Sequence, residues 1–369
     1  MRVTLLSINS LEENTGGGIY LRCLQKLYLK NGANVNVVCK SHNNRYRKNV
    51  LTDLLSRIIF LSPSFLACYL FQVIRQCKDS DIIAIHSSRL GFYAWILKKI
   101  YPHKKVYIHT DNVEFNLLKD NLLHKNIFRR ILYNIDFFLI PMSEKMCVRW
   151  GDKVTFITRE DAIDYKRMYA LTYNERHILP IYLEPNDITK KNHSQRNKII
   201  FTGSFDFYPN QEVVSRIIKI AEQTPTLQYI VAGRRLDIFI TNAGIQAPDN
   251  VTFESDIEPE RLEQLYLESR LFLCPVRHGS GMKTKIAEAL SYGLYVIANT
   301  RSTCGYETAI EAGVISCVND ATFIIDATSE IVDCFSREDK DIIYKSLHVF
   351  NENYNLNNGV KYFSEILYK

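Results

Sequence analysis

The segment Pro275–Leu290, with the sequence PVRHGSGMKTKIAEAL, combines residue types suited to binding an anion. It follows a short apolar run, Leu271–Cys274, that predicts a buried strand, and it precedes a second run, Tyr295–Ala298. Between them we expect a glycine turn and a helix that begins near Met282. Such a turn directs backbone N–H groups and the positive end of the helix dipole at a bound anion.

Three charged residues extend this prediction. Lys283 and Lys285 add positive charge beside the expected helix start. Glu288 lies farther along the same helix, and its carboxylate accepts hydrogen bonds, which suits sugar hydroxyls better than phosphate. Phosphate recognition at one end and hydroxyl recognition at the other predict a nucleotide-sugar pocket.

Two polar turns in the first half of the chain also follow predicted strands. Gly16–Gly18, which includes Gly17 and Gly18, lets backbone approach a phosphate or sugar, although a flexible turn is the plainer interpretation. His109, Asp111 and Glu114 lie directly after another strand, where a histidine could stabilise charge or accept a proton. A histidine that is merely hydrogen-bonded is the alternative.

Two more turns belong to the second half. Gly203 and Ser204 follow the strand Ile199–Phe201 and are expected to offer N–H groups to an anion, with Asn210 as the N-cap of the next helix. Arg234 follows the strand Leu227–Ala232 and adds a guanidinium suited to phosphate or carboxylate, although surface arginines are common.

Strand and helix signals alternate along the whole chain, which predicts an α/β fold with parallel sheets covered on both faces. We expect residues 1–183 to form a first domain, 184–198 a polar linker, and 199–355 a second domain, with a final helix over 356–369 that crosses back to the first. The expected strands of the first half are Val3–Ile8, Asn34–Cys39, Asp81–His86, Lys105–His109, Phe137–Met142 and Val154–Ile157.

The composition is that of a folded globular protein, with 46% hydrophobic and 23% charged residues in 369. Nine scattered cysteines lack CxxC or zinc-type spacing, so we expect structural thiols and no metal site. No signal peptide or clean transmembrane segment is evident, so we expect a cytosolic chain.

Positive charge is concentrated in the first half. Residues 1–190 hold 28 Lys and Arg against 17 Asp and Glu, a balance of +11 within a total of +6. This favours an anionic partner, such as a membrane surface, a phospholipid-linked substrate or nucleic acid; a solvated basic surface is equally compatible. The stretch Arg57–Arg75 mixes cations with Leu, Ile and Phe, as interfacial helices do, although core packing explains its apolar residues equally well.

Taken together, these motifs resemble retaining glycosyltransferases of the GT-B fold, in particular glycosyltransferase family 4, also called group 1. Two motifs of the second half carry the resemblance most strongly: F-x-G-S-x-x-x-x-P-N at Phe201–Asn210 and P-x-R-x-G-x-G-x-K-x-K-x-x-E-A-x-x-x-G-x-x-V-I-A at Pro275–Ala298. Val231–Gly233, the triple-glycine loop Gly16–Gly18 and a variant of H-N-x-E at His109–Glu114 match as well. The resemblance spans nearly the whole chain and is strongest over 199–300.

The resemblance implies two Rossmann-like domains facing a cleft and a hexosyltransferase-type enzyme that uses a nucleotide-diphosphate sugar and retains the anomeric configuration. We expect no metal requirement, because the helix dipole, glycine N–H groups and Lys283 stabilise the leaving diphosphate, and we expect no nucleic-acid partner. We expect a glycan or lipid-linked acceptor in surface polysaccharide biosynthesis. Peripheral contact with the anionic inner membrane surface is expected from the basic first half of the chain.

The resemblance implies that His109 lies near the transferred sugar, and we expect the adjacent Asp111 and Glu114 to belong to the same catalytic centre. By the resemblance, Glu288 binds the donor ribose hydroxyls, Lys283 with the backbone of Gly279–Gly281 holds the diphosphate, and Gly16–Gly18 faces the donor or acceptor. Together with the strand-end turns, the expected donor-site residues are Gly17, Gly18, Gly203, Ser204, Arg234, Arg277, His278, Gly279, Ser280, Gly281, Met282, Lys283, Thr284 and Glu288.

The chain departs from the family at one position of the Pro275–Ala298 motif. Many members carry two glutamates eight positions apart, whereas here Ser280 stands eight residues before Glu288. The residue that contacts the donor sugar itself is therefore not identified. The same departure keeps open a catalytically degenerate nucleotide-binding module. A nucleotide-sugar epimerase of the same fold is a separate alternative.

Overall fold

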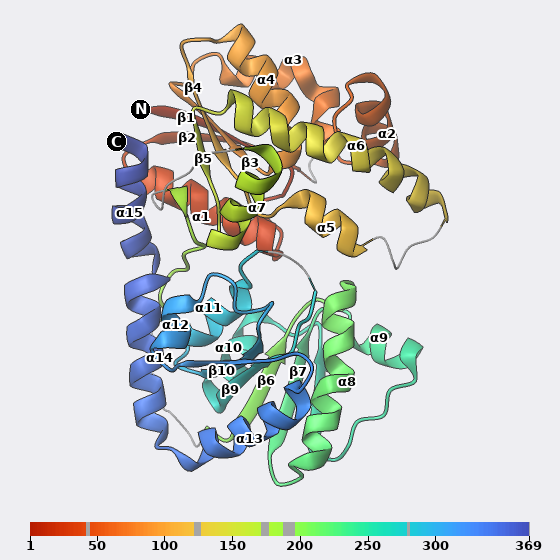
Figure 1. The fold of residues 1–369 in the computed structure, drawn as a ribbon, viewed down its shortest axis with the longest axis vertical. Coiled ribbons are helices and arrows are strands. Elements are labelled where there is room, and N and C mark those ends of the chain that lie inside the picture. The colour runs from red at the N-terminus through yellow and green to blue at the C-terminus, as the bar shows by residue number, and fades with distance from the viewer. Residues whose placement is uncertain (42–44, 122–126, 171–176, 187–195, 279–280, 369) are drawn as a thin grey trace. The chain divides into compact units, whose positions relative to one another are not determined.

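The computed structural model describes residues 1–41, 45–121, 127–170, 177–186, 196–278 and 281–368. The chain divides into two compact units, Met1–Tyr182 with Gly359–Lys369 (unit 1), and Leu183–Asn358 (unit 2). Of the expected linker 184–198, residues 187–195 lie outside the described ranges. Each unit is built on its own parallel sheet (Figure 1), which confirms the predicted pair of Rossmann-like halves.

The sheet of unit 1 is five-stranded among the described residues, with the order β2-β1-β3-β4-β5 and parallel pairing throughout. All of its strands except the edge strand β2 are largely buried, as expected when helices cover both faces. The strands are β1 (Arg2–Ser7), β2 (Asn34–Val38), β3 (Ile82–His86), β4 (Lys105–His109) and β5 (Lys153–Thr155).

Helices connect these strands in chain order. In unit 1 they are α1 (Gly16–Lys30), α2 (Val50–Ile59), η1 (Phe65–Tyr69), α3 (Leu70–Cys77), η2 (Ser88–Leu90), α4 (Gly91–Ile100), α5 (Glu114–Asn121), α6 (Ile127–Trp150) and α7 (Arg159–Tyr169).

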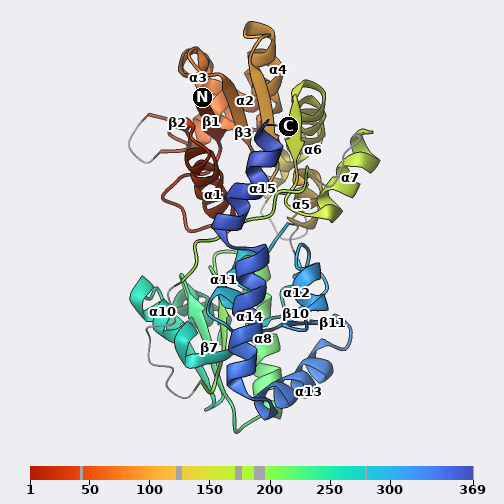
Figure 2. The same cartoon turned by 90° about the vertical axis from the view of Figure 1, so that its left-hand side faces the viewer.

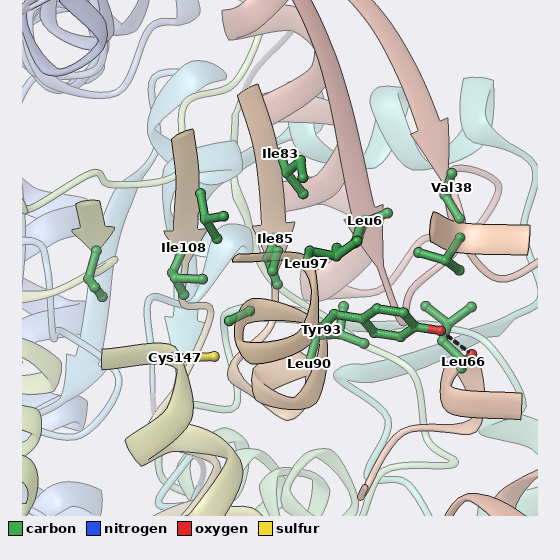
Figure 3. Packing of buried hydrophobic residues seen from close by; sticks show 14 of the residues in the cluster. Leu6, Val38, Leu66, Ile83, Ile85, Leu90, Tyr93, Leu97, Ile108 and Cys147 are labelled. Atoms are coloured by element: carbon green, nitrogen blue, oxygen red, sulfur yellow. Dashed lines mark hydrogen bonds between the residues drawn. The ribbon is translucent and has the colours of Figure 1, made fainter. Parts of the chain in front are cut away.

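A hydrophobic cluster fills one side of this sheet (Figure 3). Leu6, Ile85 and Ile108 from three adjacent strands face Tyr93 on α4, and each of these side chains is fully buried. Tyr93 Oη donates to the carbonyl of Leu66 at 2.6 Å, which satisfies the one polar atom that this ring brings into the core.

Unit 2 contains a six-stranded sheet with the order β11-β10-β9-β6-β7-β8. Figure 2 shows α8, α13 and α14 of this unit, and α13 packs against α8 while α14 packs against α11. The strands are β6 (Lys198–Thr202), β7 (Gln228–Gly233), β8 (Val251–Ser255), β9 (Ser269–Cys274), β10 (Tyr295–Asn299) and β11 (Ile315–Val318). The helices are α8 (Tyr208–Gln223), α9 (Leu236–Ala243), α10 (Pro259–Glu268), α11 (Thr284–Ser291), α12 (Glu307–Glu311), α13 (Phe323–Ser336), α14 (Asp339–Asn353) and α15 (Leu356–Tyr368).

The last helix, α15, begins in unit 2, and its residues from Gly359 onward group with unit 1. There Phe363 packs edge-on against Tyr28 of α1, with ring centroids 4.8 Å apart. A side chain at Gly359 would overlap the ring of Tyr182, so only glycine allows the helix to lie against that ring.

Three sequence-based expectations were wrong. Phe137–Met142 is not a strand but the middle of α6, which continues through Pro141, because a short apolar run alone does not distinguish a strand from a helix. Gly16–Gly18 is not a loop but the first turn of α1, capped by Thr15. Asn210 is not an N-cap, since α8 begins two residues earlier at Tyr208.

Candidate functional site

The carboxyl ends of β6, β7, β9 and β10 lie at one edge of the unit 2 sheet, because neighbouring strands run parallel. The predicted donor-site segments follow these strand ends. Gly279 and Ser280 lie outside the described residues, and the segment resumes at Gly281, whose φ of 73° is in the left-handed region that favours glycine. Met282 is buried, and α11 begins at Thr284 rather than at Met282.

Tyr306 holds the start of α11 in place. Its buried hydroxyl donates to the carbonyl of Lys283 at 2.7 Å and accepts from the N–H of Ala287 at 3.0 Å. The Lys283 carbonyl also accepts the N–H of Ile286 at 2.9 Å, so the phenol oxygen adds a second donor there and supplies an acceptor to the Ala287 N–H in the first turn. The sequence pattern of the motif does not reveal this residue, which lies past the next strand.

Lys285 projects toward α8. Its Nζ donates to Asn210 Oδ1 at 3.0 Å and lies 4.4 Å from the centre of the Phe201 ring. Burial, with the nearby charge of Lys283, lowers the pKa of Lys285 to about 8. Asn210 Nδ2 in turn donates to the Ser204 carbonyl at 2.8 Å, so one amide connects two of the predicted ligand-side segments.

Arg277 and His278 meet a carboxylate from α8. Arg277 Nη2 donates to Glu212 Oε1 at 2.9 Å, and His278 Nε2 lies 3.2 Å from Glu212 Oε2. Arg277 is exposed and His278 is half-buried. Glu212 therefore orients a guanidinium and an imidazole at the same edge as Lys285, and an anionic ligand would compete with it for them.

Glu288 contacts an aromatic hydroxyl inside unit 2. Tyr266 Oη lies 3.2 Å from Glu288 Oε2, and it also lies 2.9 Å from the hydroxyl of Thr202. Burial raises the pKa of Glu288. One carboxylate oxygen is thus oriented by Tyr266, an arrangement that suits recognition of a diol.

The turn after β6 differs from the expectation. The N–H of Gly203 donates to the carbonyl of Ala232 at 3.0 Å, so it is not available to an anion. Close packing explains the glycines instead, because a side chain at Gly233 would overlap the carbonyl of Gly203. Ser204 Oγ, by contrast, is buried without a hydrogen-bond partner in the described structure.

Arg234 is exposed and pairs with Asp206 at 2.8 Å. This ion pair lies at the carboxyl end of β7, on the same edge as the other predicted donor residues.

In unit 1, His86 and Asp111 form an unexpected buried pair at the ends of β3 and β4. Ser7 Oγ lies 2.8 Å from His86 Nδ1, which leaves Nε2 facing Asp111 Oδ2 at 3.8 Å. His86 Nε2 and Asp111 Oδ1 have no hydrogen-bond partner among the described residues. Burial and the neighbouring Glu114 raise the pKa of Asp111 to about 8, while burial lowers the pKa of His86 to about 3.

His109 is fully buried beside this pair. Its Nε2 lies 2.9 Å from Tyr28 Oη, and its Nδ1 lies 2.8 Å from Thr155 Oγ1. Both ring nitrogens are engaged, and burial lowers the pKa of His109 to about 3, so the ring is neutral. His109 supports its neighbours within the unit, and Asp111 is the member of its motif with an unpartnered oxygen.

Glu114 pairs with Arg89, whose Nε donates to Glu114 Oε2 at 2.8 Å. The backbone N–H of Glu114 donates to Glu144 Oε1 at 2.8 Å, and Tyr165 Oη donates to the same oxygen at 3.0 Å. Burial raises the pKa of Glu144 to about 7. His86, Arg89 and Glu144 were not predicted, because no local motif marks them.

Gly17 and Gly18 begin α1 beside the loop that follows β1. A side chain at Gly17 would lie 2.5 Å from the amide of Asn9, and one at Gly18 would overlap the carbonyl of Glu13. The two glycines therefore allow the loop to pack closely on the start of the helix.

Residues 196–334 match the family model described as glycosyl transferases group 1. The chain carries a group 1 glycosyl transferase domain. This match covers most of unit 2 and includes every predicted donor-site residue of that unit. The protein is therefore a glycosyltransferase.

Solved structures similar to this glycosyltransferase share its fold over nearly the full length. Sucrose-phosphate synthase from Thermosynechococcus elongatus gives a TM-score of 0.71 at 14% identity, covering 99% of this chain and 98% of that one. HepE from Anabaena in complex with UDP gives a TM-score of 0.63 at 14% identity, covering 100% of this chain and 99% of that one. WaaG, a glycosyltransferase involved in lipopolysaccharide biosynthesis, gives a TM-score of 0.64 at 13% identity, covering 100% of both chains. The similarity establishes the GT-B fold.

No curated protein matches the sequence of the glycosyltransferase. Its described residues contain no group of three or more His, Cys, Asp or Glu side chains that could hold a metal ion. Within the same ranges, no helix is long and apolar enough to span a membrane. All nine cysteines are free thiols.

Proposed function

We propose that this glycosyltransferase transfers a hexose-type sugar from a nucleotide-diphosphate donor to a glycan or lipid-linked acceptor in surface polysaccharide biosynthesis, with retention. The observation that carries the proposal is the convergence of Lys285, Arg277 and Glu288 at one edge of the unit 2 sheet. Two cations suit a diphosphate, and an oriented carboxylate suits a ribose diol. HepE, a structural relative, is described in complex with UDP-glucose.

The chemistry requires stabilisation of a leaving group rather than a metal. Breaking the bond between the anomeric carbon and the phosphate places negative charge on the departing diphosphate. The start of α11, Lys283 and Lys285 supply positive potential at that position without reorganising during the reaction. Arg277 adds to this potential, and His278 adds a hydrogen-bonding ring nitrogen, when the two side chains exchange Glu212 for the phosphates.

For unit 1 we propose acceptor recognition by Asp111 and His86. Asp111 Oδ1 is an acceptor without a hydrogen-bond partner among the described residues. His86 Nε2 also lacks such a partner there and lies 3.8 Å from the other carboxylate oxygen, Asp111 Oδ2. This arrangement suits a hydroxyl group. His109 positions this pair through the adjoining network, and Arg89 holds Glu114 at its side.

A donor panel tests the proposal. Purified protein is incubated with UDP-, GDP- and ADP-sugars, and release of free nucleotide is measured with and without glycan or lipid-linked acceptors. We expect one nucleotide sugar to be consumed, acceptor-dependent turnover, and loss of turnover in Lys285→Met and Glu288→Gln. Formation of a new nucleotide sugar without an acceptor, or binding without turnover, contradicts the proposal. NMR of the product's anomeric proton tests retention.

A further inference from the structure

Helix α2 of unit 1 buries polar side chains and exposes apolar ones, which is the reverse of a helix that packs on a hydrophobic core. Its polar residues Ser56 and Arg57 are buried, whereas Val50, Ile58 and Ile59 are 82%, 61% and 62% exposed. Val50, Leu51, Leu54 and Ile58 recur at the spacing of one helix face, and Leu51 and Leu54 are exposed as well. An amphipathic helix normally places its apolar face against the core.

Polar contacts fasten the inner side of α2. Arg57 makes two hydrogen bonds to the carboxylate of Asp136 on α6, at 2.7 and 2.9 Å, and both side chains are buried. Ser56 Oγ contacts Cys68 Sγ of η1 at 3.3 Å. Helices α2 and α6 lie side by side (Figure 1). A buried, bidentate ion pair fixes the orientation, so rotation of α2 would leave charges unpaired.

The ends of α2 are stabilised without its apolar residues. Asn49 and Thr52 form a reciprocal capping box at the start. At the other end Leu61 adopts a φ of 47°, a position where glycine or asparagine is usual, and its side chain is 58% exposed. The outward apolar side chains are therefore not needed to form the helix.

Positive charge adjoins this apolar face. Arg45, Arg47 and Lys48 are exposed on the segment directly before α2. The acidic residue on α2 is Asp53, which already lies 3.6 Å from Lys48 and 3.7 Å from Arg57. An apolar stripe beside exposed cations is the pattern of a helix that lies in the interface of an anionic bilayer.

We infer that the α2 surface, formed by Val50, Leu51, Leu54, Ile58 and Leu61 with the flanking Arg45, Arg47 and Lys48, docks the enzyme on an anionic lipid bilayer. The inference rests on the proposed function, since a lipid-linked acceptor lies in such a bilayer. Charge argues against a second copy as the occupant, because a two-fold pairing of this surface would bring the three cations of each copy together.

Vesicle flotation of the full chain tests the inference. We expect the wild type to float with vesicles of phosphatidylglycerol and phosphatidylcholine, but not with pure phosphatidylcholine, and to bind less at high salt. Leu51→Glu with Ile58→Glu should reduce the bound fraction at least tenfold, and Lys48→Glu should reduce it severalfold. A matched control is Ile325→Glu with Val332→Glu on α13, which alters equally exposed apolar residues beside Asp326 and Asp333 and should float like wild type.

Two further measurements separate this inference from the proposed function. Donor-dependent nucleotide release in solution should be unchanged in Leu51→Glu/Ile58→Glu, because the altered side chains are exposed and belong to neither candidate site. Circular dichroism should give wild-type melting. The inference is overturned if the double variant floats like wild type, if neutral vesicles bind equally well, or if the double variant only abolishes a dimer seen by light scattering.

Discussion

The Nζ atom of Lys285 lies 3.0 Å from Oδ1 of Asn210, so α11 and α8 meet through a cation and an amide rather than through an ion pair. An amide satisfies the ammonium group without neutralising its charge. The lysine therefore remains a source of positive potential for a ligand, whereas a carboxylate at position 210 would cancel it.

Donor binding should depend on the charge of Lys285. Because burial lowers its pKa to about 8, the affinity for a nucleoside diphosphate should fall as the pH rises from 7.5 to 9.5. Lys285→Met should lower the affinity about tenfold at pH 7.5, roughly 1.4 kcal/mol, and remove most of this pH dependence. Calorimetric titration with UDP, GDP and ADP measures both effects. Lys198→Met, at the amino end of β6, should bind like wild type.

Asp111 should make the folded state less stable as the pH rises. Its folded pKa is about 8 and its ordinary value is 3.8, so between these values the folded state holds a proton that the unfolded state has lost. The stabilisation is present below pH 4 and is lost as the pH rises through about 8. The melting temperature of the wild type should therefore fall relative to that of Asp111→Asn as the pH is raised from 5 to 8.5. Asp79→Asn, an exposed change, should show no such trend.

Removing the Tyr306 hydroxyl should weaken both stability and donor binding. Tyr306→Phe leaves the N–H of Ala287 and the carbonyl of Lys283 without this partner, at a loss of about 1–3 kcal/mol in the free energy of unfolding. Donor affinity should fall several-fold because the start of α11 loosens. Tyr229→Phe, which removes a buried hydroxyl bound to Thr224, should lower stability alone. Equal donor affinity in the two variants would exclude the positioning role of Tyr306.

Gly233→Ala should destabilise unit 2 more than Gly244→Ala. Both positions have positive φ, 149° and 61°, but a methyl group at 233 overlaps the Gly203 carbonyl, whereas position 244 has no atom within 4 Å. We expect a loss of about 1 kcal/mol at 244 and at least 2–3 kcal/mol at 233 in urea unfolding. Similar losses at both positions would show that backbone conformation alone accounts for the effect.

Much of the fold could be predicted because strand signals and turn residues alternate with regular spacing. Phe137–Met142 shows the limit of that approach, since a run of six apolar residues fits a buried strand as well as the middle of a long helix. Only the neighbouring turns of α6, which continue the helix on both sides, distinguish the two.

The candidate site was predictable where a local motif carries it, as for Arg277 and Glu288. Tyr306 and His86 were missed because their roles arise from contacts across the fold. Tyr306 reaches α11 from beyond β10, and His86 meets Ser7 across two paired strands. His109 had the right motif, yet the structure engages both of its ring nitrogens internally.

The reversed polarity of α2 also determines how the purified protein behaves in bulk solution. Without lipid, the exposed side chains of Val50, Leu51 and Ile58 remain in water, where they favour weak, unordered association that stops short of the two-fold dimer opposed by the flanking cations. We expect the colloidal solubility of the wild type to improve with mild detergent or with Leu51→Glu/Ile58→Glu. The second virial coefficient from static light scattering should turn more positive under either condition.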